Sequence, residues 1–272
     1  MKDFLRLSLL AAKKAGDAIL EVYNSDFSIQ TKSDNSPLTL ADTCSHNIIN
    51  SFLSATGYPV LSEEGKEFAY SQRKTWETFW MIDPLDGTKE FVKKNGEFTV
   101  NIAFIQNQAP VLGVVYAPVI QKMYYGVEGL GSFSFLTDNG MSTENIDTYV
   151  NNAVMLPCNS TDIYKIAVSV SHTTKETDDF IEEKRKIHGT VDVIVAGSSL
   201  KLCLVAEGKA NIYPRLAPTW EWDTAAGHAV AKYAGCLVYD YVTGLELVYN
   251  KENLLNPWFV AERQDINILN TN

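Results

Sequence analysis

An apolar run that ends abruptly in two aspartates is the sequence feature that most constrains the fold. Residues 80–82 are Trp-Met-Ile, Asp83 follows them directly, and Asp86 comes three positions later. A buried strand that stops at Asp83 would deliver this carboxylate to the C-terminal edge of the strand. Pro84 fixes its own φ and biases the preceding residue towards an extended conformation.

A Gly-Thr pair comes directly after the second aspartate. Gly87 permits a tight backbone approach, and Thr88 is suited to begin a helix whose free N–H groups face an anion. Two hard oxygen ligands beside such a helix start are what a Mg²⁺-dependent phosphate site requires. Asp, Pro and Gly are also ordinary turn residues. Residues 80–88 therefore fit an Asp-rich turn as well as they fit a metal site.

Composition and charge narrow the class of protein. A chain of 272 residues with 46% hydrophobic and 21% charged residues predicts a globular protein with a substantial core. The net charge of −10 argues against a binder of nucleic acid polymers, which needs a basic face. It is compatible with a phosphorylated small molecule, because carboxylates that hold divalent cations create a positive site in an acidic protein.

The cysteines and the N-terminus indicate the compartment. Cys44, Cys158, Cys203 and Cys236 are widely spaced and form no CxxC pair, so we expect reduced thiols. Residues 1–20 mix charged with apolar side chains, which predicts neither a signal peptide nor an integral membrane segment. We expect a cytoplasmic protein with no obligate protein partner; the sequence leaves peripheral membrane association open.

Hydrophobic periodicity predicts a mixed α/β order of elements. In the first part we expect helices near residues 5–22 and 39–52, a strand at 59–61, and an antiparallel meander of strands at 98–105, 111–116, 123–127 and 131–135. In the second part we expect strands at 166–170, 191–195 and 211–213 and near 238 and 259, with helices through 182–186, over 198–207 and over 223–234. The polar stretch 138–152 suggests a boundary between an N-terminal α+β subdomain, 1–140, and a C-terminal α/β subdomain, 141–272.

Acidic residues stand at several of the expected strand ends and helix starts, namely Glu63, Glu64, Asp83, Asp86 and Asp223. Each has an ordinary structural interpretation too. Glu63 and Glu64 fit a charged surface loop, and Asp223 fits a helix N-cap. Asp42 fits the partner of Thr39 in a capping box. Sequence spacing alone does not show that positions 63, 83 and 223 meet in space.

Longer motifs resemble a known family. Residues 61–64, 83–91 and 222–229 resemble the lithium-sensitive inositol monophosphatase superfamily. Residues 32–39, 95–103, 113–118, 197–201 and 213–215 look like its bacterial 3′(2′),5′-bisphosphate nucleotidase branch. The similarity runs from the first helix to near residue 260. It implies the mixed α/β fold of this superfamily and of the sugar phosphatases, a layered α/β/α/β/α sandwich.

The resemblance assigns metal chemistry to the acidic positions. It implies that the Mg²⁺ ligands are Glu63, Asp83, Asp86, Asp223 and the main-chain carbonyl of Leu85, with Glu64 acting through water on a weaker metal. Several anionic oxygens suit Mg²⁺, which is small and hard and keeps some of its water. Two or three such ions would polarise the phosphoryl oxygens, activate the attacking water and stabilise the leaving group.

The resemblance also implies contacts with water and phosphate. Thr88 and Asp42 match the pair that orients and deprotonates the attacking water, which agrees with a hydroxyl that relays a hydrogen bond and a carboxylate that accepts it. The backbone N–H groups of Gly87 and Thr88 would hold the scissile phosphate. Around the nucleotide and its 5′-phosphate would lie His172, Ser198, Lys201 and Arg215. Without its motif, Lys201 reads as an ordinary exposed helix lysine.

The sequence departs from the family pattern at three places. Val170 stands two residues before His172, where relatives commonly carry an arginine, so one phosphate contact is missing. Residues 216–217, Leu-Ala, and Glu221 also differ from the commonest pattern around the Arg and metal-Asp motifs. These departures bear on substrate affinity and ranking rather than on the metal chemistry.

The resemblance implies a Mg²⁺-dependent, lithium-inhibitable phosphatase whose partner is a small bisphosphorylated nucleotide. It would remove the 3′-phosphate of adenosine 3′,5′-bisphosphate to give AMP, and would extend to the sulfated nucleotide, in clearing a by-product of sulfate assimilation. One alternative is a related phosphatase acting on inositol phosphates or fructose 1,6-bisphosphate. Another is a catalytically silent nucleotide-binding regulator, against which stands the retention of every motif carboxylate and of Thr88.

Overall fold

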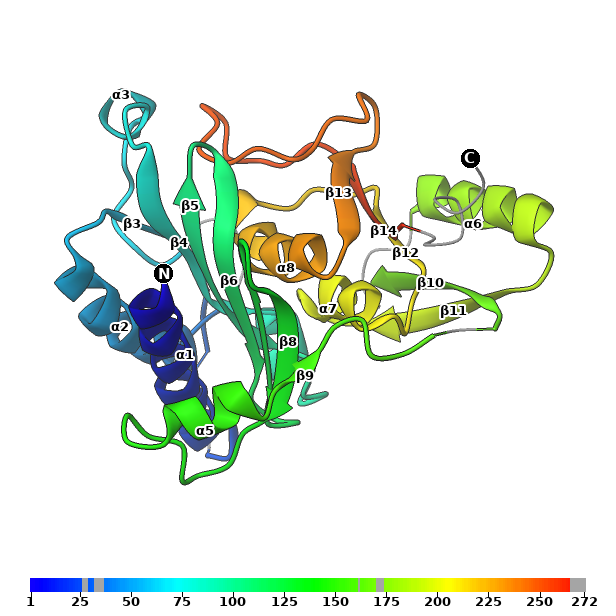
Figure 1. Ribbon diagram of the computed structural model, residues 1–272. Helices are drawn as coiled ribbons and strands as arrows, with labels where there is room; N and C mark the ends of the chain where they lie inside the picture. The colour runs from blue at the N-terminus through cyan, green and yellow to red at the C-terminus, as the bar shows by residue number, and fades with distance from the viewer. Residues whose placement is uncertain (26–28, 32–36, 161, 170–173, 265–272) are drawn as a thin grey trace.

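Two β-sheets and the helices that cover them make up the chain (Figure 1). The computed structural model describes residues 1–25, 29–31, 37–160, 162–169 and 174–264. The seven-stranded sheet has the order β3-β4-β5-β6-β7-β8-β9 and the five-stranded sheet the order β11-β10-β12-β14-β13. A short pair, β1 (Ile29–Thr31) and β2 (Pro37–Thr39), stands apart from both sheets.

The seven-stranded sheet is antiparallel except for its first pair, β3 and β4, which is parallel. Its strands are β3 (Val60–Ser62), β4 (Thr78–Asp86), β5 (Thr99–Gln106), β6 (Ala109–Ala117), β7 (Lys122–Val127), β8 (Gly131–Leu136) and β9 (Val154–Met155). The meander predicted from the short strand intervals is confirmed by the consecutive pairing from β5 to β8.

The five-stranded sheet is mixed. Its strands are β10 (Tyr164–Ser169), β11 (Val191–Ala196), β12 (Ile212–Arg215), β13 (Cys236–Asp240) and β14 (Phe259–Arg263). Strand β10 pairs in parallel with β11 and β12, and β14 is antiparallel to both of its neighbours. Parallel β10 and β11 therefore end at the same edge of the sheet.

The helices complete five layers. They are α1 (Lys2–Tyr23), α2 (Leu40–Leu53), α3 (Tyr70–Arg73), α4 (Thr88–Val92), α5 (Ile146–Asn151), α6 (Lys175–His188), α7 (Leu200–Glu207) and α8 (Glu221–Tyr233), with a 3₁₀ turn at Ser54–Thr56. Helices α1 and α2 cover one face of the seven-stranded sheet, α7 and α8 lie between the sheets, and α6 covers the outer face of the five-stranded sheet (Figure 1). The predicted layered α/β sandwich is confirmed.

Alternating side chains on β5 explain why the sheet is buried on both faces. Val100, Ile102 and Phe104 belong to the core beneath α1 and α2, while Ala103 and Ile105 belong to the core shared with α7 and α8. Successive strand residues point to opposite faces, so a strand with apolar side chains on both faces requires cover on each side.

Helix α8 lies unusually close to the sheet. A Cβ on Gly113 would stand 2.3 Å from the Ala226 carbonyl oxygen, and one on Gly126 would stand 2.4 Å from that of Ala229. Only glycine permits this approach. The backbone of α8 therefore rests directly on β6 and β7.

Within the described residues, no helix is long and apolar enough to span a membrane. The four cysteines carry free thiols. The subdomain boundary near residue 140 stays a prediction; β9 and α8, which follow it, both pack onto the seven-stranded sheet.

Candidate active site

The aspartates of the opening motif lie on a bulged strand. The sequence predicted that this strand stops at Asp83. In the structure, strand β4 continues to Asp86. Asp83 pairs with Asn101 and Asp86 with Thr99, so β4 has one more residue than β5 over this interval. The Asp-rich turn that the sequence left open is a bulge in the strand, and this bulge accommodates Pro84, which lacks the N–H that a regular ladder would use.

The bulge is followed by a short helix, as the sequence predicts. Gly87 has a φ of 93°, a left-handed conformation that favours glycine, and α4 begins at Thr88. The Leu85 N–H donates to Asp83 Oδ1 at 3.1 Å, and the Ser45 hydroxyl of α2 donates to the Pro84 carbonyl at 2.6 Å. Hydrogen bonds within β4 and from α2 thus stabilise the bulge.

Three carboxylates from separate elements converge beside the bulge. Glu63, Asp83 and Asp223 each offer an oxygen, and these oxygens lie within 4.8 Å of one another. Glu63 and Asp83 meet because β3 and β4 are parallel neighbours, and the Glu63 N–H donates to the Ile82 carbonyl at 3.3 Å. Burial differs within the group: Asp83 is buried, Asp223 half-buried and Glu63 exposed.

Asp223 occupies the third position of α8 rather than the N-cap position. The N-cap residue is Trp220, whose N–H donates to Asp223 Oδ2 at 2.8 Å. One oxygen of Asp223 thus caps the helix while the side chain also reaches the cluster. Asp223 therefore both stabilises the start of the helix and contributes an oxygen to the carboxylate cluster.

Glu221, one of the departures from the family pattern, has a structural role. Its carboxylate is fully buried and accepts from the N–H groups of Asn250 at 2.6 Å and Lys251 at 3.0 Å, and from Lys251 Nζ at 2.6 Å. It therefore anchors the loop after residue 248 to the first turn of α8, two residues before Asp223.

The clustered carboxylates disfavour one another's charge. Burial, and then the charges of Glu63, Asp86 and other neighbouring carboxylates, raise the pKa of Asp83 well above its usual value. The pKa of Asp223 is raised well above its usual value in the same way. Burial raises the pKa of Asp86 to about 6, although nearby Lys201 opposes the shift. Clustered oxygen donors that repel one another fit a divalent cation.

Other predicted residues stand around this cluster. Asp42, in the first turn of α2, is buried, and its charge contributes to the raised pKa of Asp83. Glu64 is not in the three-carboxylate group, and its charge acts on His46 instead. The predicted pairing of Asp42 with Thr88, and the roles of Leu85 and Glu64, stay predictions. The proposed capping contact from Thr39 involves a side chain outside the described set.

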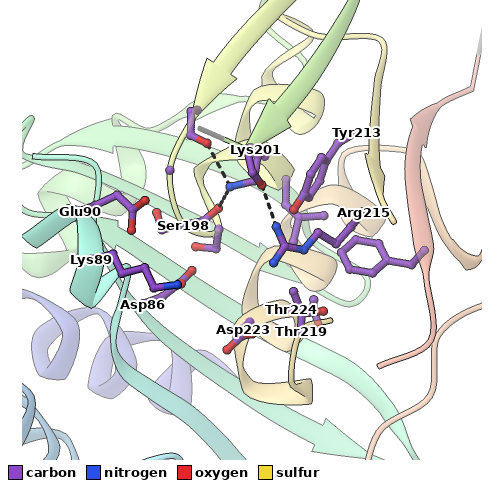
Figure 2. A pocket seen from close by; sticks show the side chains of 16 residues that line it. Asp86, Lys89, Glu90, Ser198, Lys201, Tyr213, Arg215, Thr219, Asp223 and Thr224 are labelled. Carbon is purple, nitrogen blue, oxygen red and sulfur yellow. Dashed lines mark hydrogen bonds between the residues drawn. The ribbon is translucent and has the colours of Figure 1, made fainter. Parts of the chain in front are cut away.

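Three of the predicted phosphate-binding residues line the same cavity as two of the aspartates. Asp86, Asp223, Ser198, Lys201 and Arg215 all line it (Figure 2). Figure 2 shows Lys201 and Arg215 entering from one side, with Asp86 and Asp223 on the other. Acidic and cationic groups thus face each other across one space.

Lys201 is buried, so the alternative of an ordinary exposed helix lysine is wrong. Its Nζ donates to the carbonyls of Ala196 at 3.1 Å and Ser198 at 2.5 Å. Burial lowers the pKa of Lys201 to about 8, against the opposing charge of Asp86. An ammonium has three donors, so one more is available to a ligand.

Two polar atoms at the cavity are buried without a hydrogen-bond partner among the described residues: Ser198 Oγ and Arg215 Nε. Ser198 has a φ of 44°, in the left-handed region. The Arg215 guanidinium donates through Nη1 to Ser169 Oγ at 2.8 Å and through Nη2 to the Pro218 carbonyl at 3.0 Å, which fixes its orientation. Unsatisfied buried donors are costly, so these atoms suit an anionic ligand.

The structure adds residues to the site that the sequence interpretation did not select. Lys89, Glu90, Ser169, Tyr213 and Thr219 also line the cavity. Lys89 and Glu90 belong to the motif at residues 83–91, so this motif is a signal that could have found them. Ser169 stands three positions before His172. His172 itself lies outside the described residues.

Comparison with known proteins places the chain among phosphatases. The model of the inositol monophosphatase family matches residues 1–265. The 3′(2′),5′-bisphosphate nucleotidase CysQ of Salmonella typhimurium is 43% identical over 253 residues, covering 91% of this chain and 95% of that protein. CysQ of Escherichia coli K12 is 42% identical over the same shares.

Solved structures agree on the fold. The crystal structure of CysQ from Bacteroides thetaiotaomicron, described as a bacterial member of the inositol monophosphatase family, has a TM-score of 0.88 and 48% identity, covering 95% of this chain and 96% of that one. The suhB protein of Bartonella henselae has a TM-score of 0.74 at 22% identity, covering 98% of this chain and 96% of its own, and supports the fold alone.

Proposed function

The chain belongs to the inositol monophosphatase family, and on that premise we propose that it is a metal-dependent 3′(2′),5′-bisphosphate nucleotidase. It removes the 3′-phosphate from adenosine 3′,5′-bisphosphate, giving AMP and phosphate, and acts on the sulfated nucleotide by the same route. Its similarity to bacterial proteins named for this activity, at 42–43% identity, supports the proposal.

One observation supports a substrate with two phosphates. Asp223 of the carboxylate cluster and the neighbouring Asp86 line one cavity together with a cationic pocket formed by Ser198, Lys201 and Arg215. A substrate with a single phosphate would need only one of these regions. A molecule with two phosphates fits both, one at the carboxylates through cations and one at the pocket through direct hydrogen bonds.

The donor set supports Mg²⁺, in two or three sites, as the cation. The carboxylates offered are Glu63, Asp83, Asp86 and Asp223, with the Leu85 carbonyl beside them on the bulge. Hard oxygen donors suit Mg²⁺, and Glu64 would act through water. When bound, the cations supply positive charge that polarises the phosphoryl oxygens and makes the attacking water and the leaving group more acidic.

The chain's own residues have distinct tasks in this proposal. The backbone N–H groups of Gly87 and Thr88 orient the scissile phosphate. The Thr88 hydroxyl holds the attacking water, and a carboxylate oxygen of Asp42 accepts the proton that Thr88 relays. The water then displaces the 3′-oxygen in line, with no covalent phosphoenzyme.

The second phosphate orients the substrate. Arg215 Nε, Ser198 Oγ and the remaining proton of Lys201 Nζ provide donors for the 5′-phosphate, and His172 is assigned to the same group from the sequence motif. These contacts place the 3′-phosphate at the carboxylates, because the two phosphates are fixed to one ribose.

Release of inorganic phosphate from adenosine 3′,5′-bisphosphate with Mg²⁺, and identification of AMP as the other product, test the proposal. The expected result is a higher kcat/KM on this nucleotide than on inositol 1-phosphate or fructose 1,6-bisphosphate. Faster turnover of inositol 1-phosphate would transfer the assignment to an inositol phosphatase. Tight nucleotide binding with no phosphate released would support the regulator alternative.

A further inference from the structure

A loop that lines the cationic pocket is tied to the strand beside the metal motif. Residues 97, 99 and 101 are alternate positions at and just before the start of β5, so their side chains share one face. Glu97 Oε2 accepts from the Gly197 N–H at 2.9 Å, and Thr99 and Asn101 both contact the Ser199 hydroxyl. A Cβ on Gly197 would stand 2.6 Å from the Glu97 carbonyl, so the approach is as close as glycine allows.

The hydrogen bonds at Ser199 have a direction. Ser199 Oγ donates to Asn101 Oδ1 at 2.7 Å, and a hydroxyl has one proton to give. The Thr99 hydroxyl, 2.9 Å from Ser199 Oγ, must therefore be the donor in that pair. All three side chains are nearly inaccessible, at 0%, 1% and 3% exposure for Thr99, Asn101 and Ser199.

This direction determines what Asn101 presents to Asp86. With Oδ1 engaged by Ser199, the amide turns Nδ2 towards Asp86 Oδ2, at 3.5 Å, the outer limit of a hydrogen bond. An ionised carboxylate only accepts, so the opposite amide orientation would set two acceptors against each other. The chain of donors thus runs from Thr99 through Ser199 and Asn101 to Asp86.

We propose that Asn101 and Ser199 are positioning residues for Asp86, which hold its carboxylate in the orientation that a bound divalent cation needs. The proposal rests on the proposed function in taking Asp86 as a metal ligand. Asp86 shares the cavity with buried Lys201, a competing cation. A fixed donor on Oδ2 restricts rotation of the carboxylate towards that lysine. Because Ser199 lies between Ser198 on the loop and Lys201 in the first turn of α7, the segment that binds phosphate in the proposed function also orients a metal ligand.

Metal binding, measured without substrate, tests this inference. Isothermal titration of metal-stripped protein with Mn²⁺, and again with Mg²⁺, gives the dissociation constants. Asn101→Leu keeps a similar volume but removes the donor, and we expect about 10-fold weaker binding, the lower end for residues that orient metal ligands. Ser199→Ala should weaken binding in the same direction but less, because Asn101 then loses only the bond that fixes its amide.

The double variant separates a linked chain from two unrelated structural effects. If Ser199 acts through Asn101, Asn101→Leu with Ser199→Ala binds the metal no more weakly than Asn101→Leu alone. Independent effects would multiply, since residues without shared partners are additive in free energy. A multiplicative loss would overturn the proposal.

Matched variants control for packing. Thr99→Ser keeps the hydroxyl and Thr99→Val keeps the shape, so the first should retain wild-type metal affinity and the second should weaken it. Ser8→Ala removes another buried hydroxyl, bonded to the Phe4 carbonyl on α1, and should leave the dissociation constant unchanged. If Asn101→Leu does not fold, the Thr99 pair and Ser199→Ala still decide the question.

Failure of this inference differs from failure of the proposed function. Unchanged Mn²⁺ and Mg²⁺ affinity in folded Asn101→Leu and Ser199→Ala, with a wild-type protein that hydrolyses the nucleotide, overturns the positioning role alone. A wild-type protein that binds the cations with the expected dependence on Asn101 but releases no phosphate overturns the nucleotidase proposal and leaves the positioning role supported.

Discussion

The carboxylate cluster and the cationic pocket differ in how they are built and in what they lack. The cluster is assembled by main-chain pairing: Glu63 and Asp83 meet because β3 and β4 are parallel neighbours, and Asp223 joins them from α8. The pocket is assembled by a loop and a strand end that leave Ser198 Oγ and Arg215 Nε without partners among the described residues. One region has excess negative charge and the other has unsatisfied donors.

Under the proposed function, each region would be completed by a different ligand. Cations relieve the repulsion that raises the pKa values of Asp83 and Asp223. In the proposed function, a phosphate would satisfy the buried donors of the pocket. Changes in the cluster should therefore act on catalysis and metal binding, and changes in the pocket on substrate affinity.

The largest effect is expected in the cluster. Asp83→Asn removes one ligand charge, and kcat should fall by about a thousandfold or more, since a catalytic metal supplies several kcal/mol to the transition state. The metal-free variant should at the same time melt higher than metal-free wild type, because an uncharged amide ends the repulsion with its neighbours. Activity assays and thermal unfolding in a chelator measure the two effects.

If the role of Asp83 were structural, the melting temperature of the metal-free variant would not rise. If Asp83 mainly supported the bulge through its bond from the Leu85 N–H, the variant would melt lower or be unchanged. Loss of both activity and stability would therefore break the proposed distinction between the two regions.

The next largest effect is expected in the pocket. Arg215→Met removes donors to the second phosphate, and KM for adenosine 3′,5′-bisphosphate should rise by about 10- to 100-fold, the range for charge-assisted hydrogen bonds of 1.5–3 kcal/mol. The kcat value should change little, because the carboxylates are untouched. Steady-state kinetics check this, and a loss confined to kcat would contradict it.

A smaller effect is expected from pH. The pKa of Lys201 is lowered to about 8, so its ammonium loses a proton as the pH rises through this value. Affinity for an anionic substrate should then fall by up to about tenfold one unit above the pKa, as KM follows the charged fraction. A KM–pH profile measures this, and Lys201→Met should flatten it above pH 8 at a uniformly raised KM.

The smallest effect is expected in the stability of the metal-free protein. The pKa of Asp86 is raised to about 6, above its unfolded value near 3.9, so its contribution to stability is fully present below the unfolded pKa and is lost as the pH rises through the folded one. Without metal, the melting temperature should fall by about a few degrees across this window. Saturating Mg²⁺ should reverse the fall, because bound carboxylates must be ionised.

Thermal unfolding in a chelator and with Mg²⁺ checks this sign. Asp86→Asn should reduce the pH dependence of the metal-free protein. A metal-free wild type that gains stability over the same window would show that salt bridges, and not repulsion, dominate the cluster.

Much of the fold could be predicted because periodicity reports which faces are buried. The meander from β5 to β8 follows from closely spaced apolar runs. The bulge at Pro84 could not be predicted, since the same residues form a turn unless a partner strand supplies the ladder. Long-range pairing of β4 with β5 decided between the two.

In the candidate site, too, some residues could be predicted from motifs and some contacts could not. The motif segments contain many of the residues that line the cavity, yet nothing in the sequence links Asn101 to Ser199, 98 positions away. The burial of Lys201 was equally hidden, because it depends on how α7 packs between the sheets. Contacts between distant segments are what a linear pattern lacks.

Substrates with and without the 5′-phosphate test most directly whether the carboxylate cluster and the cationic pocket have separate tasks. The ratio of kcat/KM for adenosine 3′,5′-bisphosphate to that for adenosine 3′-monophosphate should be measured in wild type and in Arg215→Met, each with saturating Mg²⁺. The proposed separation of tasks predicts a large ratio in wild type that falls towards unity in the variant, with the rate on the monophosphate nearly unchanged. A ratio near unity in wild type, or one that survives Arg215→Met, would contradict it.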